Sequence, residues 1–214
     1  MNRTSDDPTP FRVVPLTTDD LEQSFELVTR VFVDGSTLHR ALRIDLDLYR
    51  SYLRPSFDAM VAEGLSVMVV EPVSQRILGC LIVTAFAPPV GGANHRFAPL
   101  AALTSELVAR YRQKRQLRPG EAALVDMGAV APEVSGGGLY KAMRDRAHHT
   151  ARKRGFRFVL GELSSAATQH VVLGRMGHRA MAKVAFAEFE YQGARPFASI
   201  KTPESLILSE GDLR

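Results

Sequence analysis

Three titratable side chains lie where acid–base chemistry could use them. Asp126 interrupts the apolar run 123–131, and a carboxylate in such a run needs a partner or a chemical reason to be there. Glu162 ends the next apolar run, and His170 opens a short helical segment. Each can accept or donate a proton in a reaction. Each also has a structural interpretation: a buried hydrogen bond or ion pair for Asp126, an exposed strand-end charge for Glu162, and a solvated or capping histidine for His170.

Three consecutive glycines, Gly136 to Gly138, follow the run that contains Asp126 and precede an amphipathic helical pattern at 139–154. A loop of this kind can direct backbone N–H groups and the positive end of the helix dipole toward an anion. The spacing is neither G-x-G-x-x-G nor G-x-x-x-x-G-K-[ST], which disfavours a Rossmann dinucleotide site and an ordinary nucleotide-phosphate loop. A flexible turn is the alternative interpretation of the glycines alone.

Metal and nucleophile chemistry have little support in the sequence. His148 and His149 are adjacent on the predicted helix, and adjacent positions do not share a face. There is no Cys/His cluster of the kind that holds a metal, and no serine in a nucleophile elbow. Cys80 lies inside an apolar run, where a small buried core residue is the expected role.

Composition bounds the class of protein. A chain of 214 residues suits one domain with a sizeable core, and a single cysteine excludes an internal disulfide framework. Without a membrane-length apolar run or a signal-peptide pattern, we expect a cytoplasmic protein with no membrane partner. The net charge is +4, with basic residues gathered at 110–118 and 141–157. These clusters are either solvated helix faces or an attraction for an anionic ligand, and nucleic acid is not an expected partner.

Hydrophobic periodicity predicts strands and helices in a mixed order. Residues 1–9 are expected to form a flexible tail and 10–214 a single domain. The expected helices are 21–33, 46–63, 100–118, 139–154 and 168–176, and the expected strands are 11–16, 65–70, 77–86, 121–131, 156–163, 180–191 and 205–209. This order predicts an α/β fold: a single mixed, mostly antiparallel sheet of about seven strands with helices on both faces.

Three local expectations follow from elementary rules. Pro55 should kink or split the second helix. Alternation along the strand at 121–131 should place Leu124, Asp126, Gly128 and Val130 on one face. The connection at 87–99, rich in proline and glycine, is expected to border a substrate entrance.

The run V-A-P-E-V-S-G-G-G-L-Y at 130–140 resembles the acetyl-CoA loop of the GNAT N-acetyltransferases, V-x-P-x-x-[RQ]-x-x-G-x-[GA]. Val130, Pro132 and Gly138 match that pattern. Farther on, V-L-G-R-M-G-H at 172–178 resembles the family's L-Y-x-K-x-G-F segment. The opening R-V-V-P-L-T-T-D-D-L is similar to a typical GNAT first strand and helix, so the resemblance extends over 11–200.

Within that superfamily the chain is most similar to the arylalkylamine N-acetyltransferases. F-V-D-G-S-T-L at 32–38 resembles their F-x-D-E-P-L, and F-A-E-F-E-Y at 186–191 is followed by Pro196-Phe197. Several positions depart from the family pattern. Ser135 stands where the loop has Arg or Gln, and Tyr140 where it has Gly or Ala. Leu173 replaces a tyrosine that relatives use as a general acid, and Gly35-Ser36 replaces a Glu-Pro.

The resemblance implies an acetyl-CoA-dependent N-acetyltransferase that uses acetyl-CoA as co-substrate and a small-molecule primary amine as acceptor, with direct attack of the amine. It implies that Asp126 is the first candidate for the base, Glu162 the second, and His170 a proton donor or acceptor. Cofactor contacts are implied from three strand residues toward the pantetheine arm and from the loop and helix start toward the pyrophosphate. These cofactor-binding residues are Gly128, Ala129, Val130, Ser135, Gly136, Gly137, Gly138, Leu139, Tyr140 and Lys141.

Two alternatives stay open at this point. The missing tyrosine and glutamate are compatible with a non-catalytic acyl-CoA-binding protein on the same fold. The basic helices are compatible with a macromolecular acceptor, such as a protein N-terminus or an aminoacyl-tRNA. A homodimer is also compatible with the sequence.

Overall fold

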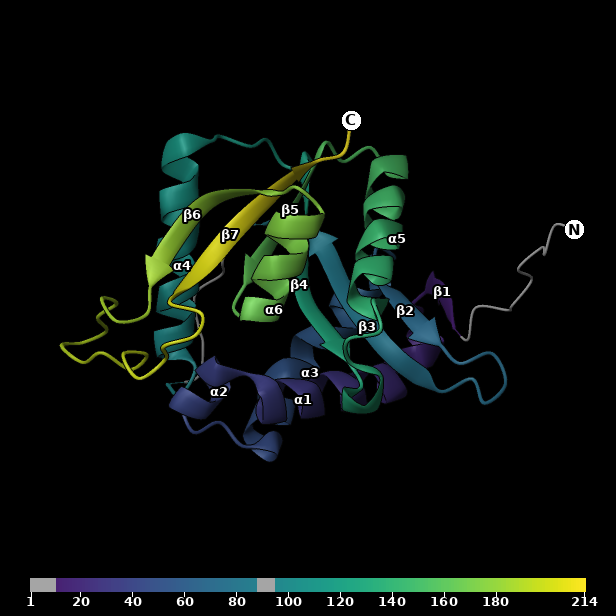
Figure 1. Cartoon of the computed structure of the whole chain (residues 1–214), viewed down its shortest axis with the longest axis horizontal. Helices are drawn as coiled ribbons and strands as arrows, with labels where there is room; N and C mark the ends of the chain where they lie inside the picture. The colour runs from purple at the N-terminus through teal and green to yellow at the C-terminus, as the bar shows by residue number, and fades with distance from the viewer. Residues whose placement is uncertain (1–10, 88–94) are drawn as a thin grey trace, which may run out of the picture.

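The computed structural model describes residues 11–87 and 95–214. The predicted tail and most of the 87–99 connection therefore lie outside the described residues. The described residues form a seven-stranded sheet with the order β1-β2-β3-β4-β5-β7-β6 (Figure 1). Its strands are β1 (Arg12–Pro15), β2 (Val67–Val70), β3 (Ile77–Ala85), β4 (Ala122–Val130), β5 (Phe158–Leu163), β6 (Arg179–Ala185) and β7 (Ser205–Asp212).

Neighbouring strands are antiparallel except β4 and β5, which are parallel. The predicted mixed, mostly antiparallel sheet is therefore confirmed. The longer helices are α1 (Leu21–Gly35), α3 (Leu46–Ala62), α4 (Ala98–Lys114) and α5 (Leu139–Lys153). The shorter helical segments are η1 (Thr18–Asp20), α2 (Thr37–Ala41), η2 (Pro132–Val134), α6 (Ala166–Gln169) and η3 (His170–Arg175).

Side-chain alternation along the central strands shows which helices cover which face. Cys80 and Ile82 of β3 pack in one cluster with residues of α1 and α3. Leu81 and Val83, one position on, pack with Leu139 and other residues of α5. The sheet thus separates α5 from α1 and α3, while α4 contributes to a third cluster with β5, β6 and β7 (Figure 1). Helices on both faces were predicted and are confirmed.

A bulge in β4 and the end of its pairing with β5 shape the centre of the molecule. The β3–β4 register shifts between Ile82 and Val83, which pair with Met127 and Val125, so Asp126 is the extra residue. Parallel pairing with β5 ends at Val125 opposite Gly161. Beyond that point the two strands diverge, and no strand of the described chain pairs with this edge of β4.

Because of this bulge, the side-chain alternation predicted along β4 is wrong beyond Asp126. Leu124 belongs to the cluster that contains α4, whereas Val130 packs in the cluster of α5. The extra residue between them places every later side chain of β4 on the opposite face of the sheet from the one predicted. Leu124, Gly128 and Val130 therefore do not share one face, as uninterrupted alternation had predicted.

Several predicted boundaries were also wrong. Pro55 does not split the second long helix, because α3 is continuous from Leu46 to Ala62, and the alternative of a kink at Pro55 stays a prediction. The strand expected at 180–191 ends at Ala185, whereas the one expected at 205–209 continues to Asp212 and lies inside the sheet between β5 and β6. The helix expected at 168–176 is two segments, α6 and η3, and α2 was not predicted. Cys80 is fully buried, as predicted. No helix in the described ranges has both the length and the apolar character needed to cross a bilayer.

A buried carboxylate on β7 fixes α4 against the sheet. Glu210 accepts hydrogen bonds from Arg115 Nε (2.6 Å) and Nη2 (2.8 Å), from Arg179 Nη2 (2.7 Å) and from the Tyr111 hydroxyl (2.7 Å). The Glu210 side chain is fully buried, while Arg115 and Arg179 reach solvent. Two cations and a hydroxyl offset the desolvation of this carboxylate, and they connect α4 and β6 to β7.

Glu210→Gln should lower the free energy of unfolding by about 3 kcal/mol, because the buried site loses its charge and leaves two arginines without their partner. Urea unfolding followed by circular dichroism measures the change. Asp212→Asn is the matched control on the same strand. It removes an exposed pair with Arg214 and should change stability by less than about 1 kcal/mol. Equal effects of the two substitutions would contradict the anchoring role of Glu210.

Candidate active site

A cavity of about 460 Å³ opens where β4 and β5 diverge. This volume falls in the range of small-ligand sites. Residues of α1 to α4 line one part of the cavity, and Tyr140 and Arg144 of α5 line another. Since the sheet separates α5 from α1 and α3, the cavity is open to both faces at the point where the strands part.

Asp126 and Glu162 both line this cavity. The Thr84 hydroxyl donates to Asp126 Oδ2 at 2.6 Å, and the Thr104 hydroxyl of α4 donates to Glu162 Oε2 at 3.2 Å. Burial raises the pKa of Asp126 to about 7, and the nearby charge of Glu162 contributes to that rise. Burial likewise raises the pKa of Glu162 to about 7. The structure thus brings together two carboxyl groups, each of which can gain or lose a proton near neutral pH.

His170, the third predicted candidate, is not part of this group. It lies exposed on η3 and does not line the cavity. Its place near the start of a short helix was predicted correctly, but the helix does not direct it toward the carboxyl groups. Among residues 11–87 and 95–214, no group of three or more potential ligands could hold a metal ion.

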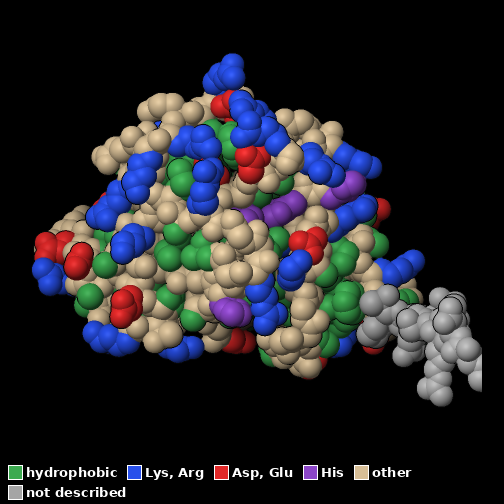
Figure 2. Space-filling model, turned by 45° about the horizontal axis from the view of Figure 1, so that its top comes forward, with side chains coloured by type: hydrophobic (Ala, Val, Ile, Leu, Met, Phe, Trp, Pro, Cys, Tyr) green, Lys and Arg blue, Asp and Glu red, His purple; other side chains and the backbone are tan. Residues whose placement is uncertain are grey.

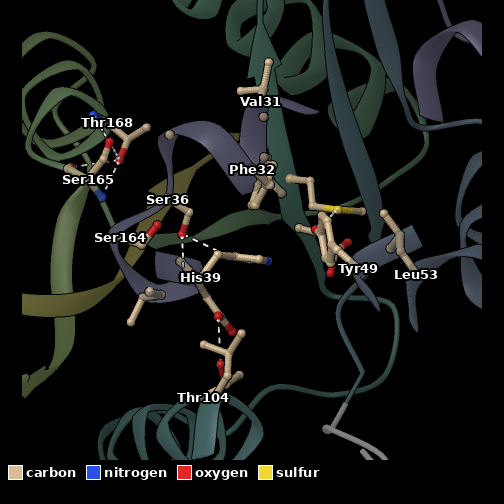
Figure 3. Close-up of a pocket in the computed structure, with 18 of the residues that line it drawn as sticks. Val31, Phe32, Ser36, His39, Tyr49, Leu53, Thr104, Ser164, Ser165 and Thr168 are labelled. Carbon is tan, nitrogen blue, oxygen red and sulfur yellow. Dashed lines mark hydrogen bonds between the residues drawn. The ribbon is translucent and has the colours of Figure 1, made fainter. Parts of the chain in front are cut away.

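The structure adds His39, which sequence reasoning did not single out. Its Nδ1 lies 3.0 Å from the Ser36 hydroxyl, and its Nε2 has no hydrogen-bonding partner among the described residues. Burial lowers its pKa to about 4, so the ring is neutral at pH 7. In Figure 3 the ring extends from α2 toward Tyr49. Because α2 itself was not predicted, no sequence pattern placed this histidine at the cavity.

Aromatic rings form much of the cavity wall on the side of α1 to α4. The His39 ring packs edge-on against Tyr49 at 4.5 Å and against Phe32 at 5.7 Å, measured between centroids. Tyr52 stacks on Phe97 at 3.8 Å. These side chains line the cavity together with His39. Such a wall suits an apolar, ring-containing ligand.

The glycine turn has the geometry that an anion-binding loop needs. Gly138 is the N-terminal cap of α5 with φ +80°, and Gly136 has φ +84°, conformations that L side chains rarely adopt. A Cβ at either glycine would meet no atom within 4 Å, so the turn is open around both. The first N–H groups of α5 lack intrahelical acceptors and lie directly after this turn.

The basic residues of the 141–157 cluster are distributed along α5 and beyond its C-terminal end rather than gathered at the glycine turn. Lys141 Nζ bonds Asp145 at 2.7 Å on the same helix, and Arg157 bonds Glu121 at 2.9 Å. Figure 2 shows Lys and Arg side chains over much of the visible surface with acidic side chains between them. This pattern favours the solvated-face interpretation for these two residues.

The strand edge expected to meet the cofactor arm is available for hydrogen bonding. Gly128, Ala129 and Val130 pair with β3 on one side, and β5 does not reach their other side. The Tyr140 ring lies against Gly128: a Cβ there would be 2.7 Å from its Cε2. Tyr140 therefore turns toward β4, and it narrows the gap between the strands.

Neither a family model nor a curated protein matches the sequence. Solved structures do resemble it. The C-terminal condensation domain of Ebony, in complex with β-alanyl-dopamine, is 15% identical with a TM-score of 0.85, over 94% of this chain and 98% of that one. Arylalkylamine N-acetyltransferase 2 from Aedes aegypti is 14% identical with a TM-score of 0.82, over 96% and 100%. A NatC complex bound to Gag peptide and CoA is 13% identical with a TM-score of 0.56, over 96% and 100%. The predicted fold is thereby confirmed: this chain has the fold of the GNAT acetyltransferases.

Proposed function

We propose that this protein is an acetyl-CoA-dependent N-acetyltransferase that acts on a small primary amine carrying an aromatic ring. The observation that carries the proposal is the pair Asp126 and Glu162, two carboxyl groups with pKa values near 7 in an aromatic-walled cavity. The pair lies where β4 and β5 diverge, beside an open strand edge.

The chain's own residues fit the expected co-substrate. The turn at Gly136 and Gly138 and the start of α5 would hold the pyrophosphate through backbone N–H groups. The open edge of Gly128 to Val130 would pair with the pantetheine arm. Acetyl-CoA would supply the acetyl thioester at the mouth of the gap, next to Asp126.

The two carboxyl groups can perform the proton transfers that amide formation requires. An alkylammonium has a pKa near ~10.4, so it first releases one proton to solvent to give the neutral amine, and a base must remove a second proton from the nitrogen as the amide forms. As the nitrogen bonds to the acetyl carbon, the carbon–sulfur bond breaks and the sulfur takes up a proton. Both pKa values lie near 7 and the charge of Glu162 disfavours ionisation of Asp126, so the pair can hold one charged and one protonated carboxyl group near pH 7. The charged one accepts the proton from nitrogen, and the protonated one supplies the proton to sulfur.

A small acceptor fits the cavity better than a macromolecule. The cavity volume of about 460 Å³ and the aromatic wall suit a single-ring amine. The structures that resemble this chain at TM-scores of 0.82 to 0.85 carry an arylalkylamine acetyltransferase name or a bound dopamine amide, whereas the peptide-bound NatC complex matches at 0.56. Efficient turnover of a free amine would also exclude the non-catalytic alternative.

Acetyl-CoA binding depends, on this proposal, on the left-handed conformation of Gly138. Gly138→Ala should weaken acetyl-CoA binding about 10-fold in calorimetry, because Ala strains the turn that presents the N–H groups. Gly155→Ala is the matched control: it has φ +88° and equal free space, but it lies at the other end of α5. It should leave the affinity unchanged. A wild-type protein that binds no acetyl-CoA at millimolar concentration would refute the proposal.

The carboxyl pair should control the pH dependence of turnover. With phenethylamine at saturation, kcat measured from CoA release should rise to a maximum near pH 7 and fall above it, because the base works only when ionised and the acid only when protonated. Asp126→Asn and Glu162→Gln should each lower kcat about 10²–10³-fold. In Glu162→Gln the midpoint of the rise should move to lower pH, since Asp126 loses a like charge that raises its pKa.

Asp47→Asn, an exposed carboxylate on α3, is the control and should change neither kcat nor the midpoint. A flat profile between pH 6 and 8 in the wild type, or full activity in both carboxyl variants, would remove the pair from the mechanism.

A further inference from the structure

Helix α5 directs two side chains, one turn apart, into the gap between β4 and β5. The Tyr140 ring lies against Gly128 of β4. The Arg144 guanidinium lies against Gly161 of β5, where a Cβ would be 2.7 Å from Nη2 and 3.1 Å from Nη1. Each strand thus has a glycine where the helix side chain needs the space. Tyr140 and Arg144 both line the cavity that holds the carboxyl pair.

Arg144 is a buried cation that forms no ion pair with any of the described residues. The residue is 1% exposed. Its Nε and Nη2 donate to the Tyr140 hydroxyl at 3.1 and 2.9 Å, and Nη1 has no partner among the described residues. None of the ion pairs within residues 11–87 and 95–214 includes Arg144. The uncharged hydroxyl oxygen of Tyr140 is therefore the only hydrogen-bond acceptor for the Arg144 side chain in the described chain.

This arrangement is unfavourable unless a further group completes it. A guanidinium does not lose its proton in proteins, so burial cannot neutralise Arg144 as it would a lysine or histidine. Its neighbours do not compensate. Burial lowers the pKa of His148 to about 3 and of His178 to about 4, with the charge of Arg144 as a further cause, so both rings are neutral. The missing complement is an anion.

The pair offers two donors to such an anion. Arg144 Nη1 carries N–H groups without an acceptor among the described residues. The Tyr140 hydroxyl accepts two hydrogen bonds from Arg144 and still has its own proton to donate. Two donors and a positive charge match the two oxygens of a carboxylate. The phosphates of a CoA thioester have their own expected place at the glycine turn.

We propose that Tyr140 and Arg144 form a receptor for a carboxylate carried by one of the two reactants, a deepening that rests on the proposed acyl transfer. The carboxylate has two potential sources. It is either the far end of a dicarboxylic acyl donor or the carboxyl group of an amino-acid acceptor. Either reactant enters the cavity that both residues line.

Calorimetry with matched probes tests the receptor and separates the two sources. Succinyl-CoA and acetyl-CoA share every phosphate and differ by a terminal carboxylate in the acyl group. Phenylalanine and phenethylamine differ by one carboxylate in the acceptor, and their binding can be measured without any donor. One carboxylated probe should bind the wild-type protein at least ~10-fold tighter than its neutral counterpart.

Two variants assign that preference to the receptor. Arg144→Met should abolish a 10- to 100-fold preference without lowering the melting temperature, because it removes an unpaired buried charge and keeps the apolar stem. Tyr140→Phe keeps the ring and should reduce the preference about 3- to 10-fold. Arg146→Met, an exposed position on the same helix, should leave it unchanged.

The outcomes separate this inference from the proposed function. A preference for succinyl-CoA that Arg144→Met removes identifies the donor as the source, and a preference for phenylalanine identifies the acceptor. If the wild-type protein shows no preference within either pair of probes, the receptor is overturned, even where acetyl-CoA binds and turns over. An equal loss of affinity for charged and neutral probes in Arg144→Met, with a lower melting temperature, shows a structural role and also overturns it. If the protein binds no CoA but still prefers phenylalanine to phenethylamine, the proposed acyl transfer is rejected and the receptor stands.

Discussion

The parting of two parallel strands is the constraint on which this molecule depends. Up to Val125 and Gly161 the backbones of β4 and β5 satisfy each other, and beyond that pair the facing edge of β4 is left without a strand. An unpaired edge inside a protein has to find other partners. The gap supplies them in two ways: it admits side chains from both faces of the sheet, and it leaves backbone groups for a ligand. The bulge at Asp126 lies one residue after the divergence and aims a carboxylate at the opening.

Charge placement around this opening follows from desolvation. Two carboxyl groups are enclosed there without a cation close enough to hold them ionised, so their pKa values rise toward neutrality. On the side of α5 the Arg144 guanidinium is more deeply buried, and it has no carboxylate partner among the described residues. An ion pair between Arg144 and one of the two carboxyl groups would have kept that carboxyl group ionised at neutral pH. It would also have left Arg144 without free N–H groups for a ligand. Elsewhere the molecule neutralises buried charge fully, as around Glu210.

The sequence was sufficient for the architecture and for part of the site. Periodicity located the strands and long helices because burial repeats along them, and the glycine turn was found because left-handed backbone at a helix start favours glycine. Asp126 and Glu162 stood out as charges in apolar runs. The bulge at Asp126 carries no sequence mark, so the facing of Gly128 was wrong. His39 lay in no predicted element, and Arg144 lay in the predicted helix at 139–154 without a mark that set it apart. Only the tertiary fold, which places Arg144 against Gly161, removes both side chains from solvent.

The glycines at 128 and 161 have a consequence for how this pocket can change. Because both strands lack side chains there, the depth and polarity of the gap are set by positions 140 and 144 of a single helix. On the proposed function, substitutions at positions 140 and 144 would change the wall of the gap while the bulge, the carboxyl pair and the glycine turn keep their places. Under that proposal, two positions of one helix would determine which reactant the cavity accepts, separately from the residues that transfer the protons.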